Sequence, residues 1–449
     1  MNDQPIRLAV VGTGYVGLTT GACFAHLGHH VVCADIDPRK VDLLNAGHIP
    51  IVEEGLESIV NAARAAGLLE FVLGAETAAG DADIVFLCVP TPQGDDGSAD
   101  LSYIQTAAAQ IAPVLKPGAI VVNKSTVPVG STIAVERVLE RSDVHVVSNP
   151  EFLREGTAVH DFLHPDRVVI GSADRRAAER VAELYAAVDT PIHITDPASA
   201  ETIKYAANGF LAMKISFVNA VAAMCEAVGA DVAAVVEGIG ADQRIGTQFL
   251  RPGPGWGGSC FPKDSRALVK IAEDHGYDFS MMRGVIEVND EQLDRMVDKI
   301  ARAAGRPFHD LNGVTIGALG LTFKAGTDDL RESPAIRLGG ALLERGASVA
   351  AFDPVALATG VALLTGGGPD VPVEAAATAV AACAGADAVV VATEWPEFRS
   401  LDWAAIAATM SGRLIIDGRR VVDTEAASAA GLRVVALGVE VTGAALQLR

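Results

Sequence analysis

The sequence has few aromatic residues and a shortage of positive charge. Phe, Trp and Tyr make up 5% of its 449 residues, and 35 Lys and Arg stand against 56 Asp and Glu, which gives a formal net charge of −21. A chain this acidic lacks the basic surface that nucleic acids and anionic membranes bind. An anionic small molecule is not excluded, because a pocket needs only a few local cations and helix N-termini. We therefore expect a small-molecule ligand, and neither nucleic acid nor a membrane as partner.

Paired cysteine spacing and a secretory leader are also lacking. The six cysteines are scattered along the chain, at Cys23, Cys33, Cys88, Cys225, Cys260 and Cys383. This pattern is typical of reduced thiols in a cytoplasmic protein and favours neither a disulfide framework nor a zinc site. No charged and then apolar segment precedes the first predicted strand. We expect a cytoplasmic protein without a bound metal.

The sequence also lacks a long uncharged hydrophobic run. The most membrane-like segment, residues 205–229, is interrupted by Asn208, Lys214, Asn219 and Glu226. A spanning helix needs roughly 20 nearly uncharged residues. The segment instead predicts a long helix buried between domains or subunits.

The chain begins with a dinucleotide-binding pattern. Residues 6–11 predict a strand, residues 18–27 a helix of small residues, and residues 30–34 a second strand that ends at Asp35. An ordinary strand-turn-helix is the alternative, but the acidic residue in register makes it hard to keep. A carboxylate at that position accepts from both ribose hydroxyls and repels a 2′-phosphate, which favours NAD over NADP.

The glycines of this pattern have separate tasks. Gly12 allows a tight turn, Gly14 lets the backbone approach a pyrophosphate, and Gly17 brings helix and strand together. The cofactor-binding residues predicted from the pattern are Val11, Gly12, Gly14, Tyr15, Val16, Gly17 and Asp35.

Further strands predict an open parallel sheet. Residues 82–89 form a continuous apolar run, as expected for a buried parallel strand, and residues 120–123 and 145–148 predict two more strands. Polar residues follow all three strands, namely Thr91, Ser125-Thr126 and Asn149-Pro150-Glu151. Ligands of open parallel sheets bind beyond these ends.

The C-terminal third repeats the plan without the glycine pattern. Residues 314–319 predict a strand that leads to Gly320, and Gly346 and Asp353 bracket a further strand at the spacing of Gly28 and Asp35. This predicts a Rossmann-like domain for the nucleotide part of a substrate, and no second dinucleotide. Residues 198 to about 300 predict a helical connector with loops at 238–240 and 251–263.

The stretch GWGGSCFPKD, residues 255–264, raises the question of chemistry. Its glycines permit close backbone approach and positive φ, and Lys263 adds positive potential that favours a thiolate at Cys260. Such a thiol near a nicotinamide indicates oxidation beyond the aldehyde. A buried structural cysteine is the equal alternative, and we expect the other five cysteines to lie in the core.

Lys204 and Asn208 stand four residues apart and share one face at the start of the long helix. Together they could stabilise an alkoxide or a tetrahedral oxyanion. A lysine that extends from a helix end to solvent is the equal alternative.

Five separated motifs carry a family resemblance. The segments STVPVG, SNPEFLREG, KYAANGFLAMKISFVN, GGSCFPKD and GLTFKAGTDDLRES occur in the family's order, and the likeness runs through essentially the whole chain. The sequence resembles the UDP-glucose/GDP-mannose dehydrogenase family, and within it the UDP-glucose 6-dehydrogenase group. Members oxidise C6 of a nucleotide-linked hexose twice with two NAD.

The resemblance implies roles for individual residues. It makes Cys260 the thiohemiacetal and thioester nucleophile, Lys204 and Asn208 oxyanion stabilisers, Asp264 a support for lysine and water, and Glu151 a base with a water held by Thr126. Implied NAD contacts are Lys40, Thr91, Thr126, Glu155, Lys263 and Arg331. Implied substrate contacts are Glu151, Phe152, Leu153, Arg154, Lys204, Asn208, Arg244, Phe249, Leu250, Arg251, Gly253, Gly257, Phe323 and Lys324.

The implied architecture is α/β, with an NAD-binding Rossmann domain over residues 1–196, a helical dimerisation region over 197–300 and a UDP-binding Rossmann-like domain over 301–449. Arg244 matches an arginine that members lend to the neighbouring subunit, which implies a homodimer on the long helix. Trp256 and Ala325-Gly326 depart from the usual residues of the family's sugar-nucleotide loops.

Several functions remain open at this point. Relatives act on GDP-mannose or on UDP-N-acetyl amino sugars such as UDP-N-acetylmannosamine with the same cysteine, lysine and asparagine. A two-electron hydroxyacid dehydrogenase would need no cysteine. A non-catalytic NAD-sensing protein is disfavoured by the intact set of catalytic residues.

Overall fold

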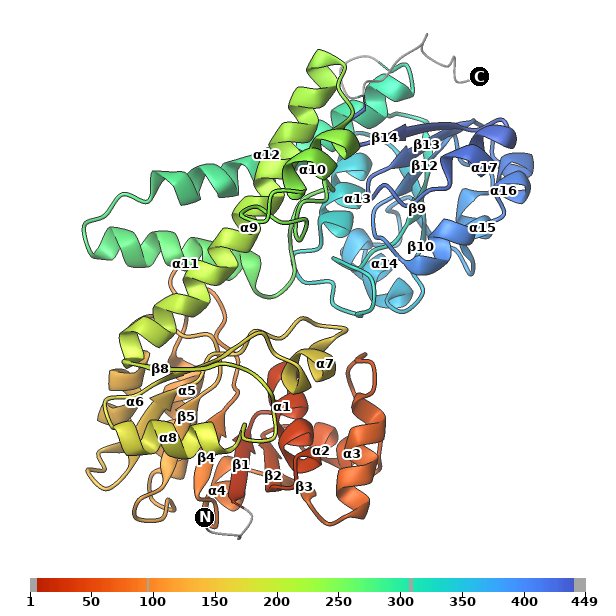
Figure 1. Ribbon diagram of the computed structural model, residues 1–449. Coiled ribbons are helices and arrows are strands. Elements are labelled where there is room, and N and C mark those ends of the chain that lie inside the picture. Colours follow the sequence, from red (N-terminus) through yellow and green to blue (C-terminus); the bar gives the residue numbers. More distant parts are fainter. Residues whose placement is uncertain (1–5, 95–96, 307–309, 440–449) are drawn as a thin grey trace. The chain divides into compact units, whose positions relative to one another are not determined.

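The computed structural model describes residues 6–94, 97–306 and 310–439 (Figure 1). These residues belong to two compact units. The first comprises the chain up to residue 207 together with residues 270–277, and the second comprises residues 208–269 and the chain from residue 278. We describe each unit by itself.

The first unit contains an eight-stranded sheet with the order β3-β2-β1-β4-β5-β6-β7-β8. Its strands are β1 (Arg7–Val11), β2 (His30–Asp35), β3 (Leu69–Leu73), β4 (Ile84–Leu87), β5 (Ile120–Asn123), β6 (His145–Ser148), β7 (Val168–Gly171) and β8 (Ile192–Thr195). All neighbours are parallel except β6 and β7. The strands predicted at 120–123 and 145–148 are confirmed to the residue.

Helices cover both faces of this sheet, which is why its strands are continuously apolar. One core contains Leu8 and Val10 of β1, and the other contains Ala9 and Val11. The first core takes side chains from α1 (Tyr15–His26), α2 (Pro38–Asn45), α3 (Leu56–Ala65), α7 (Ala158–Leu163) and α8 (Arg175–Glu183). The second takes them from α4 (Ala75–Ala79), α5 (Ser102–Ile111) and α6 (Ser131–Leu139).

Four helices follow this sheet in the chain. They are α9 (Pro197–Val228), α10 (Val232–Gly240), α11 (Phe261–Asp274) and α12 (Ser280–Ala303). The predicted loop at 251–263 is confirmed up to the start of α11. The loop predicted at 238–240 is wrong, because α10 runs through Gly240 and the Ala241 N–H still bonds to the Glu237 carbonyl. Two glycines weaken a helix, but the hydrogen bonds of its last turn are kept here.

Within the described residues, α9 is the one helix that has the length and composition of a membrane span, with a mean hydropathy of 1.5 in its most apolar window. Its polar side chains bond within the fold. Ser216 donates to the Val285 carbonyl, and Asn219 accepts from the Gly253 N–H. These bonds are those of a helix packed against protein.

The second unit contains a six-stranded, all-parallel sheet with the order β11-β10-β9-β12-β13-β14. Its strands are β9 (Thr315–Leu319), β10 (Ser348–Phe352), β11 (Val373–Ala375), β12 (Ala388–Val391), β13 (Leu414–Asp417) and β14 (Arg433–Ala436). The helices that accompany it are α13 (Pro334–Glu344), α14 (Leu357–Thr365), α15 (Ala379–Cys383), α16 (Trp403–Thr409), α17 (Thr424–Ala429) and the 3-10 turn η1 (Pro396–Ser400).

The two sheets repeat one plan, as the Gly346 and Asp353 spacing predicts. Asp35 accepts from the Thr13 N–H and hydroxyl, and Asp353 accepts from the Leu321 and Thr322 N–H groups. Asp353 also accepts from the Trp395 indole and is 2% exposed, so its oxygens are used inside the protein. That the second sheet binds no dinucleotide stays a prediction.

Candidate active site

The glycine turn after β1 has the shape that a dinucleotide needs. Gly12 has a φ of 97°, and a Cβ there would lie 2.6 Å from the Cys88 carbonyl oxygen. A Cβ on Gly17 would lie 1.9 Å from the Gly12 oxygen, so helix and turn touch at this point. A Cβ on Gly14 would meet nothing within 4 Å, which leaves open space where a pyrophosphate would approach the start of α1. The turn therefore fits NAD.

Asp35 ends β2 with its carboxylate held in place. Its Oδ2 accepts from the Thr13 N–H (3.0 Å) and hydroxyl (2.6 Å) and from Lys40 Nζ (3.2 Å), and its Oδ1 accepts from the Asp37 N–H (3.1 Å). Burial raises the pKa of this carboxyl, but these hydrogen bonds and the Lys40 charge together hold it below its usual value. Asp35 is therefore an anion that can accept from a ribose.

Other predicted cofactor residues of the first unit lie in two separate contacts. The Thr91 hydroxyl donates to the Thr126 carbonyl (2.9 Å), which links the ends of β4 and β5. The Tyr15 hydroxyl donates to the Val52 carbonyl and accepts from the Gly156 N–H, next to Glu155. The sequence analysis missed Glu53, a buried carboxylate that accepts from the Gly156 and Val159 N–H groups.

Glu151 and Lys204 form a buried ion pair after β6. Lys204 Nζ lies 2.9 Å from Glu151 Oε1, and both side chains are 4% exposed. The Leu153 N–H donates to Glu151 Oε2 at 2.6 Å. Burial raises the Glu151 pKa, but Lys204, this N–H and the more distant Lys124 together hold the pKa below its usual value. The pair joins an anionic carboxylate, suited to act as a base, to a lysine.

The neighbouring backbone is fixed by two arginines. The Phe152 ring stacks on the Arg167 guanidinium at 3.7 Å and also faces Lys204 at 5.3 Å. Arg154 forms hydrogen bonds to Asp161 through its backbone N–H, Nε and Nη2. The segment 152–154 thus presents backbone rather than a free cation. Arg167, which directly precedes β7, was missed in the sequence analysis.

Cys260 differs from the other cysteines. It is half-buried at the start of α11, while the remaining five are buried, as predicted. Burial raises the pKa of Cys23 and Cys88 to about 12, so those thiols are inert. The Cys260 Sγ lies 3.5 Å from the Ser259 hydroxyl. A thiol at the N-terminal end of a helix is in the electrostatic setting that favours a thiolate.

Asp264 organises the polar groups one turn beyond Cys260. It is fully buried, and its two oxygens accept from Lys263 Nζ and Asn208 Nδ2, each at 2.6 Å. The predicted partners Asn208, Lys263 and Asp264 therefore form one cluster. Lys263 forms an ion pair with Asp264, and the effect of its charge on the Cys260 thiol stays a prediction.

The glycine-rich loop before Cys260 is held in place by hydrogen bonds to side chains of neighbouring helices. The Gly253 N–H donates to Asn219 and its carbonyl accepts from Gln292, and the Trp256 indole donates to Ser216. A Cβ on Gly257 would lie 2.0 Å from the Glu332 carbonyl oxygen. The predicted positive φ occurs at Gly255 (122°) and Gly258 (80°). These glycines let the loop pack closely, and Trp256 is accommodated there by a hydrogen bond.

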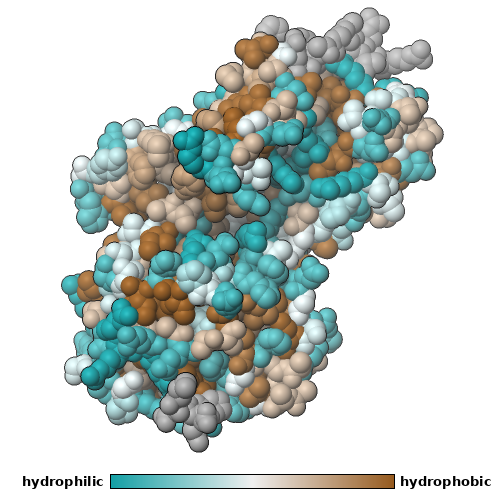
Figure 2. Space-filling model, viewed as in Figure 1, coloured by the Kyte–Doolittle hydropathy of each residue, from teal (hydrophilic) through white to brown (hydrophobic). Residues whose placement is uncertain are grey.

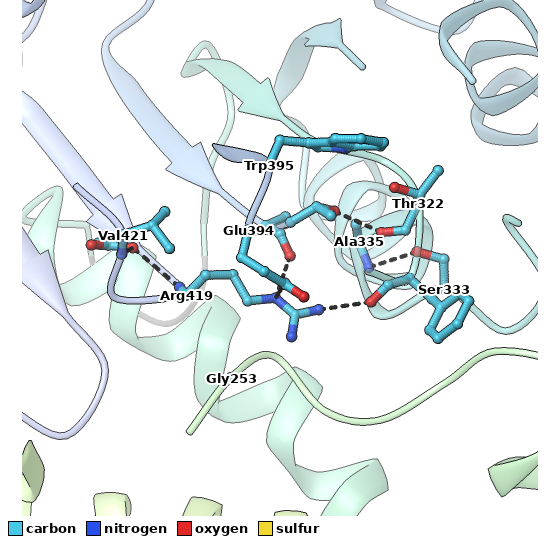
Figure 3. A network of polar contacts seen from close by, with 12 residues as sticks. Gly253, Thr322, Ser333, Ala335, Glu394, Trp395, Arg419 and Val421 are labelled. Atoms are coloured by element: carbon cyan, nitrogen blue, oxygen red, sulfur yellow. Dashed lines mark hydrogen bonds and ion pairs between the residues drawn. The ribbon is translucent and has the colours of Figure 1, made fainter. Parts of the chain in front are cut away.

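Arg419 was also missed by the sequence analysis. Its Nη2 donates to the Phe323 carbonyl (2.9 Å), and its Nε donates to the Ala392 carbonyl (2.8 Å) and lies 3.1 Å from Glu394 Oε2. Figure 3 shows this side chain extended beside Glu394 and above the backbone at Gly253. A Cβ on Gly253 would lie 3.2 Å from Arg419 Nη1. Arg419 thus joins two predicted substrate residues, Gly253 and Phe323.

The remaining predicted residues of the second unit are less tightly grouped. Lys324 lies over the Phe323 ring at 5.6 Å, and Arg331 forms a hydrogen-bonded ion pair with Asp329. Arg244 is exposed and paired with Asp242. Phe249 has a φ of 61°, Leu250 is buried and Arg251 is exposed. Over the described part of the chain, no group of three or more His, Cys, Asp or Glu is placed to hold a metal.

These features are typical of one class of enzymes, the NAD-linked dehydrogenases with a candidate covalent thiol. They are a dinucleotide turn with a carboxylate suited to a ribose, a buried carboxylate–lysine pair, and a half-buried thiol at the start of a helix. Family models describe the chain more closely. The NAD binding domain, central domain and UDP binding domain of the UDP-glucose/GDP-mannose dehydrogenase family match residues 6–189, 198–291 and 317–424.

Individual proteins agree with these matches. The chain is 45% identical over 443 residues to a UDP-glucose 6-dehydrogenase of Rhizobium meliloti (strain 1021), which covers 96% of this chain and 99% of that protein. A solved UDP-glucose dehydrogenase of Pyrobaculum islandicum is 39% identical, with a TM-score of 0.88 and coverage of 95% and 96%. A UDP-D-ManNAc dehydrogenase of Pyrococcus horikoshii is 28% identical, with a TM-score of 0.84 and coverage of 96% and 99%.

This chain belongs to the UDP-glucose/GDP-mannose dehydrogenase family. It carries the family's NAD binding domain, and the predicted fold class is confirmed: an N-terminal Rossmann-like sheet, a central helical region with a long helix, and a C-terminal parallel sheet.

Proposed function

We propose that this protein oxidises C6 of UDP-glucose twice, with two NAD per sugar, to give UDP-glucuronate. Full-length similarity to a UDP-glucose 6-dehydrogenase supports the substrate. The observation that carries the four-electron chemistry is the half-buried Cys260 at the start of α11, since a two-electron dehydrogenase needs no thiol.

The first oxidation converts the C6 alcohol to an aldehyde. Glu151, directly or through a water held by Thr126, takes the hydroxyl proton, and Lys204 stabilises the developing alkoxide. Bound NAD supplies the hydride acceptor for both oxidations. The 2.9 Å Glu151–Lys204 contact supports this division of roles, because the carboxylate stays ionised while the ammonium faces it.

The second oxidation proceeds on Cys260. Its thiolate adds to the aldehyde carbon, and the resulting alkoxide takes up a proton to complete a thiohemiacetal. Loss of hydride from C6 and of the hydroxyl proton leaves a thioester. Water then attacks the thioester carbon and gives one proton to Glu151, the C–S bond breaks to release the thiolate, and the carboxylic acid that forms loses its proton to solvent. Asn208 and Asp264 stabilise and order the tetrahedral stages, which their 2.6 Å hydrogen bond supports.

The binding roles stay as the resemblance implies them. We propose that Lys40, Thr91, Glu155, Lys263 and Arg331 contact NAD, in addition to the glycine turn and Asp35. We propose that the segments 152–154 and 249–257 and residues Phe323 and Lys324 bind the sugar nucleotide, within domains spanning 1–196, 197–300 and 301–449. The lack of a disulfide among the six cysteines, all of which lie in the described residues, supports a cytoplasmic location.

The substrate is tested by counting NADH. With UDP-glucose we expect two NADH for each sugar consumed and a uronic acid as product. GDP-mannose and UDP-N-acetylmannosamine serve as comparison substrates and should turn over at least about tenfold more slowly. One NADH per sugar would contradict the four-electron assignment, and preference for either comparison substrate would contradict UDP-glucose.

We further propose that the enzyme is a homodimer built on α9. Phe210, Phe217, Met224 and Val228 are each more than half exposed, and their spacing of seven, seven and four places them on one side of the helix. Figure 2 shows apolar side chains in brown at the upper end of α9. A heptad-spaced apolar stripe on a long helix suits packing against its own copy.

In this dimer, Arg244 serves the partner's substrate site. The test is co-expression of two inactive chains, Arg244→Ala and Cys260→Ala. A mixed dimer then holds one complete site, with a thiol from the first chain and an arginine from the second. We expect recovery of about a quarter of the wild-type NADH rate, since half of the dimers are mixed and each has one intact site. If Arg244 acts within its own chain, no mixed dimer has a complete site and no activity returns.

A further inference from the structure

The end of β5 carries a buried lysine that no role above uses. Lys124 follows β5 directly and is 5% exposed. Its Nζ donates to Asn149 Oδ1 (3.1 Å) and to the Tyr185 hydroxyl (3.3 Å), both of which are neutral groups. Across residues 6–94, 97–306 and 310–439, this ammonium has no carboxylate within 4.0 Å.

The groups that receive this lysine are themselves satisfied. The Tyr185 hydroxyl donates to Asn149 Oδ1 at 2.7 Å, and Asn149 Nδ2 donates to the Val169 carbonyl at 2.8 Å. The tyrosine and the asparagine would therefore remain hydrogen-bonded to each other without a cation. Burying an ammonium without a paired carboxylate costs several kcal/mol. The network itself does not require the charge, so another part of the site must use it.

Glu151 stands two residues after Asn149, the side chain that accepts from Lys124 Nζ, and its charge interacts with that of Lys124. Burial lowers the pKa of Lys124 to about 8, with Glu151 opposing the shift and Lys204 adding to it. The other titratable neighbours are Cys88, whose thiol stays protonated, and Tyr185, whose pKa burial raises. Lys124 is therefore mostly protonated at neutral pH, and it lowers the pKa of Glu151 in turn.

We propose that Lys124 is a positioning residue that keeps Glu151 ionised when Lys204 turns to the substrate oxygen. This rests on the proposed function for the roles of Glu151 and Lys204. With one lysine alone, a carboxylate that lost its partner to the substrate would stand unpaired in a buried site and take up a proton. The second lysine prevents this without competing for the substrate, because its ammonium is held by Asn149 and Tyr185.

The net charge of the three buried residues Glu151, Lys204 and Lys124 agrees with this role. Glu151, Lys204 and Lys124 carry a surplus of one positive charge when all three are ionised. An alkoxide or tetrahedral oxyanion that develops on the substrate brings this small group to neutrality. A site with its surplus charge already in place stabilises a developing anion without reorganisation.

The test compares the pH dependence of kcat in the intact enzyme with NAD and UDP-glucose. We expect Lys124→Met to lower kcat about 10- to 100-fold near neutral pH, with the KM for NAD unchanged. Its acidic limb should move to higher pH, because Glu151 loses a charge that lowers its pKa. Lys124→Arg keeps the charge and should return the limb towards its wild-type position. Lys124→Gln is a second neutral variant.

Tyr185→Phe is the control, since it removes the hydrogen bonds of the Tyr185 hydroxyl to Lys124 and Asn149 but no charge. The acidic limb of the pH profile of kcat for Tyr185→Phe should stay at its wild-type position even if the melting temperature of this variant falls. An unmoved limb in both neutral Lys124 variants, or an equal movement in Tyr185→Phe, overturns the proposal. Infrared titration of the Glu151 carboxylate, assigned by its absence in Glu151→Gln, measures the same shift without substrate. It separates failure of this proposal from failure of the proposed function.

Discussion

Replacing Cys260 with alanine is expected to abolish formation of the uronic acid while leaving NAD binding intact. The thiol is the only group assigned to hold the sugar during the second oxidation, so no thiohemiacetal or thioester can form. We expect the rate of uronic acid formation to fall by at least about a thousandfold. Quantifying uronic acid and NADH per sugar by chromatography, with NAD affinity measured in parallel, checks this result.

Cys260→Ser distinguishes the thiol from its position. A serine keeps the size of the side chain but is a far weaker nucleophile and a poorer leaving group, so the reaction should stall near the aldehyde or at a slow ester. Cys225→Ser is the matched control at a buried cysteine and should change stability rather than stoichiometry. Release of uronic acid at the wild-type rate by Cys260→Ser would refute the covalent route.

The second large effect is expected at Lys204. Lys204→Ala should lower kcat at least about a thousandfold, because it removes the cation assigned to the oxyanion. It should also destabilise the fold by about 3 to 5 kcal/mol, since the buried Glu151 loses its paired charge. Steady-state kinetics and denaturant unfolding measure the two effects separately.

A double variant separates catalysis from stability. Lys204→Met combined with Glu151→Gln removes both charges, so most of the lost stability should return while activity stays low. Recovery of activity in the double variant would assign Lys204 a structural role. Equal losses in turnover and in NAD affinity for Lys204→Ala would lead to the same conclusion.

Much of the cofactor site could be predicted because its signal is local. The turn needs a positive φ at Gly12 and open space at Gly14, and both requirements leave a glycine in the sequence. Asp35 lies at the end of a strand that follows the turn at a fixed spacing. The contrast between Cys260 and the other cysteines was also readable, since those five stand in apolar periodic segments.

Other features of the site depend on residues that are far apart in the chain. Arg419 reaches the Phe323 carbonyl across 96 positions, and Lys124 reaches the Tyr185 hydroxyl across 61. Neither residue stands in a pattern that marks it, because an arginine after a strand or a lysine after one is common. The error at residues 238–240 has a different cause, since glycine weakens a helix without always ending it.

The sequence by itself determined the parallel strands β1, β2, β4, β5 and β6 of the first sheet and β9 and β10 of the second, the NAD turn, the long apolar helix and the motifs of the nucleotide-sugar dehydrogenases. Hydrophobic periodicity and glycine spacing are properties of residues that are close together in the chain, so they can be read directly from the sequence. Only the tertiary structure decided which charges meet: Lys204 pairs with Glu151 and Lys263 with Asp264, whereas Lys124 has no carboxylate within ion-pair distance among the described residues. Side-chain pairing across strands and loops is set by packing, and a buried charge gains or loses its partner only when the chain is folded.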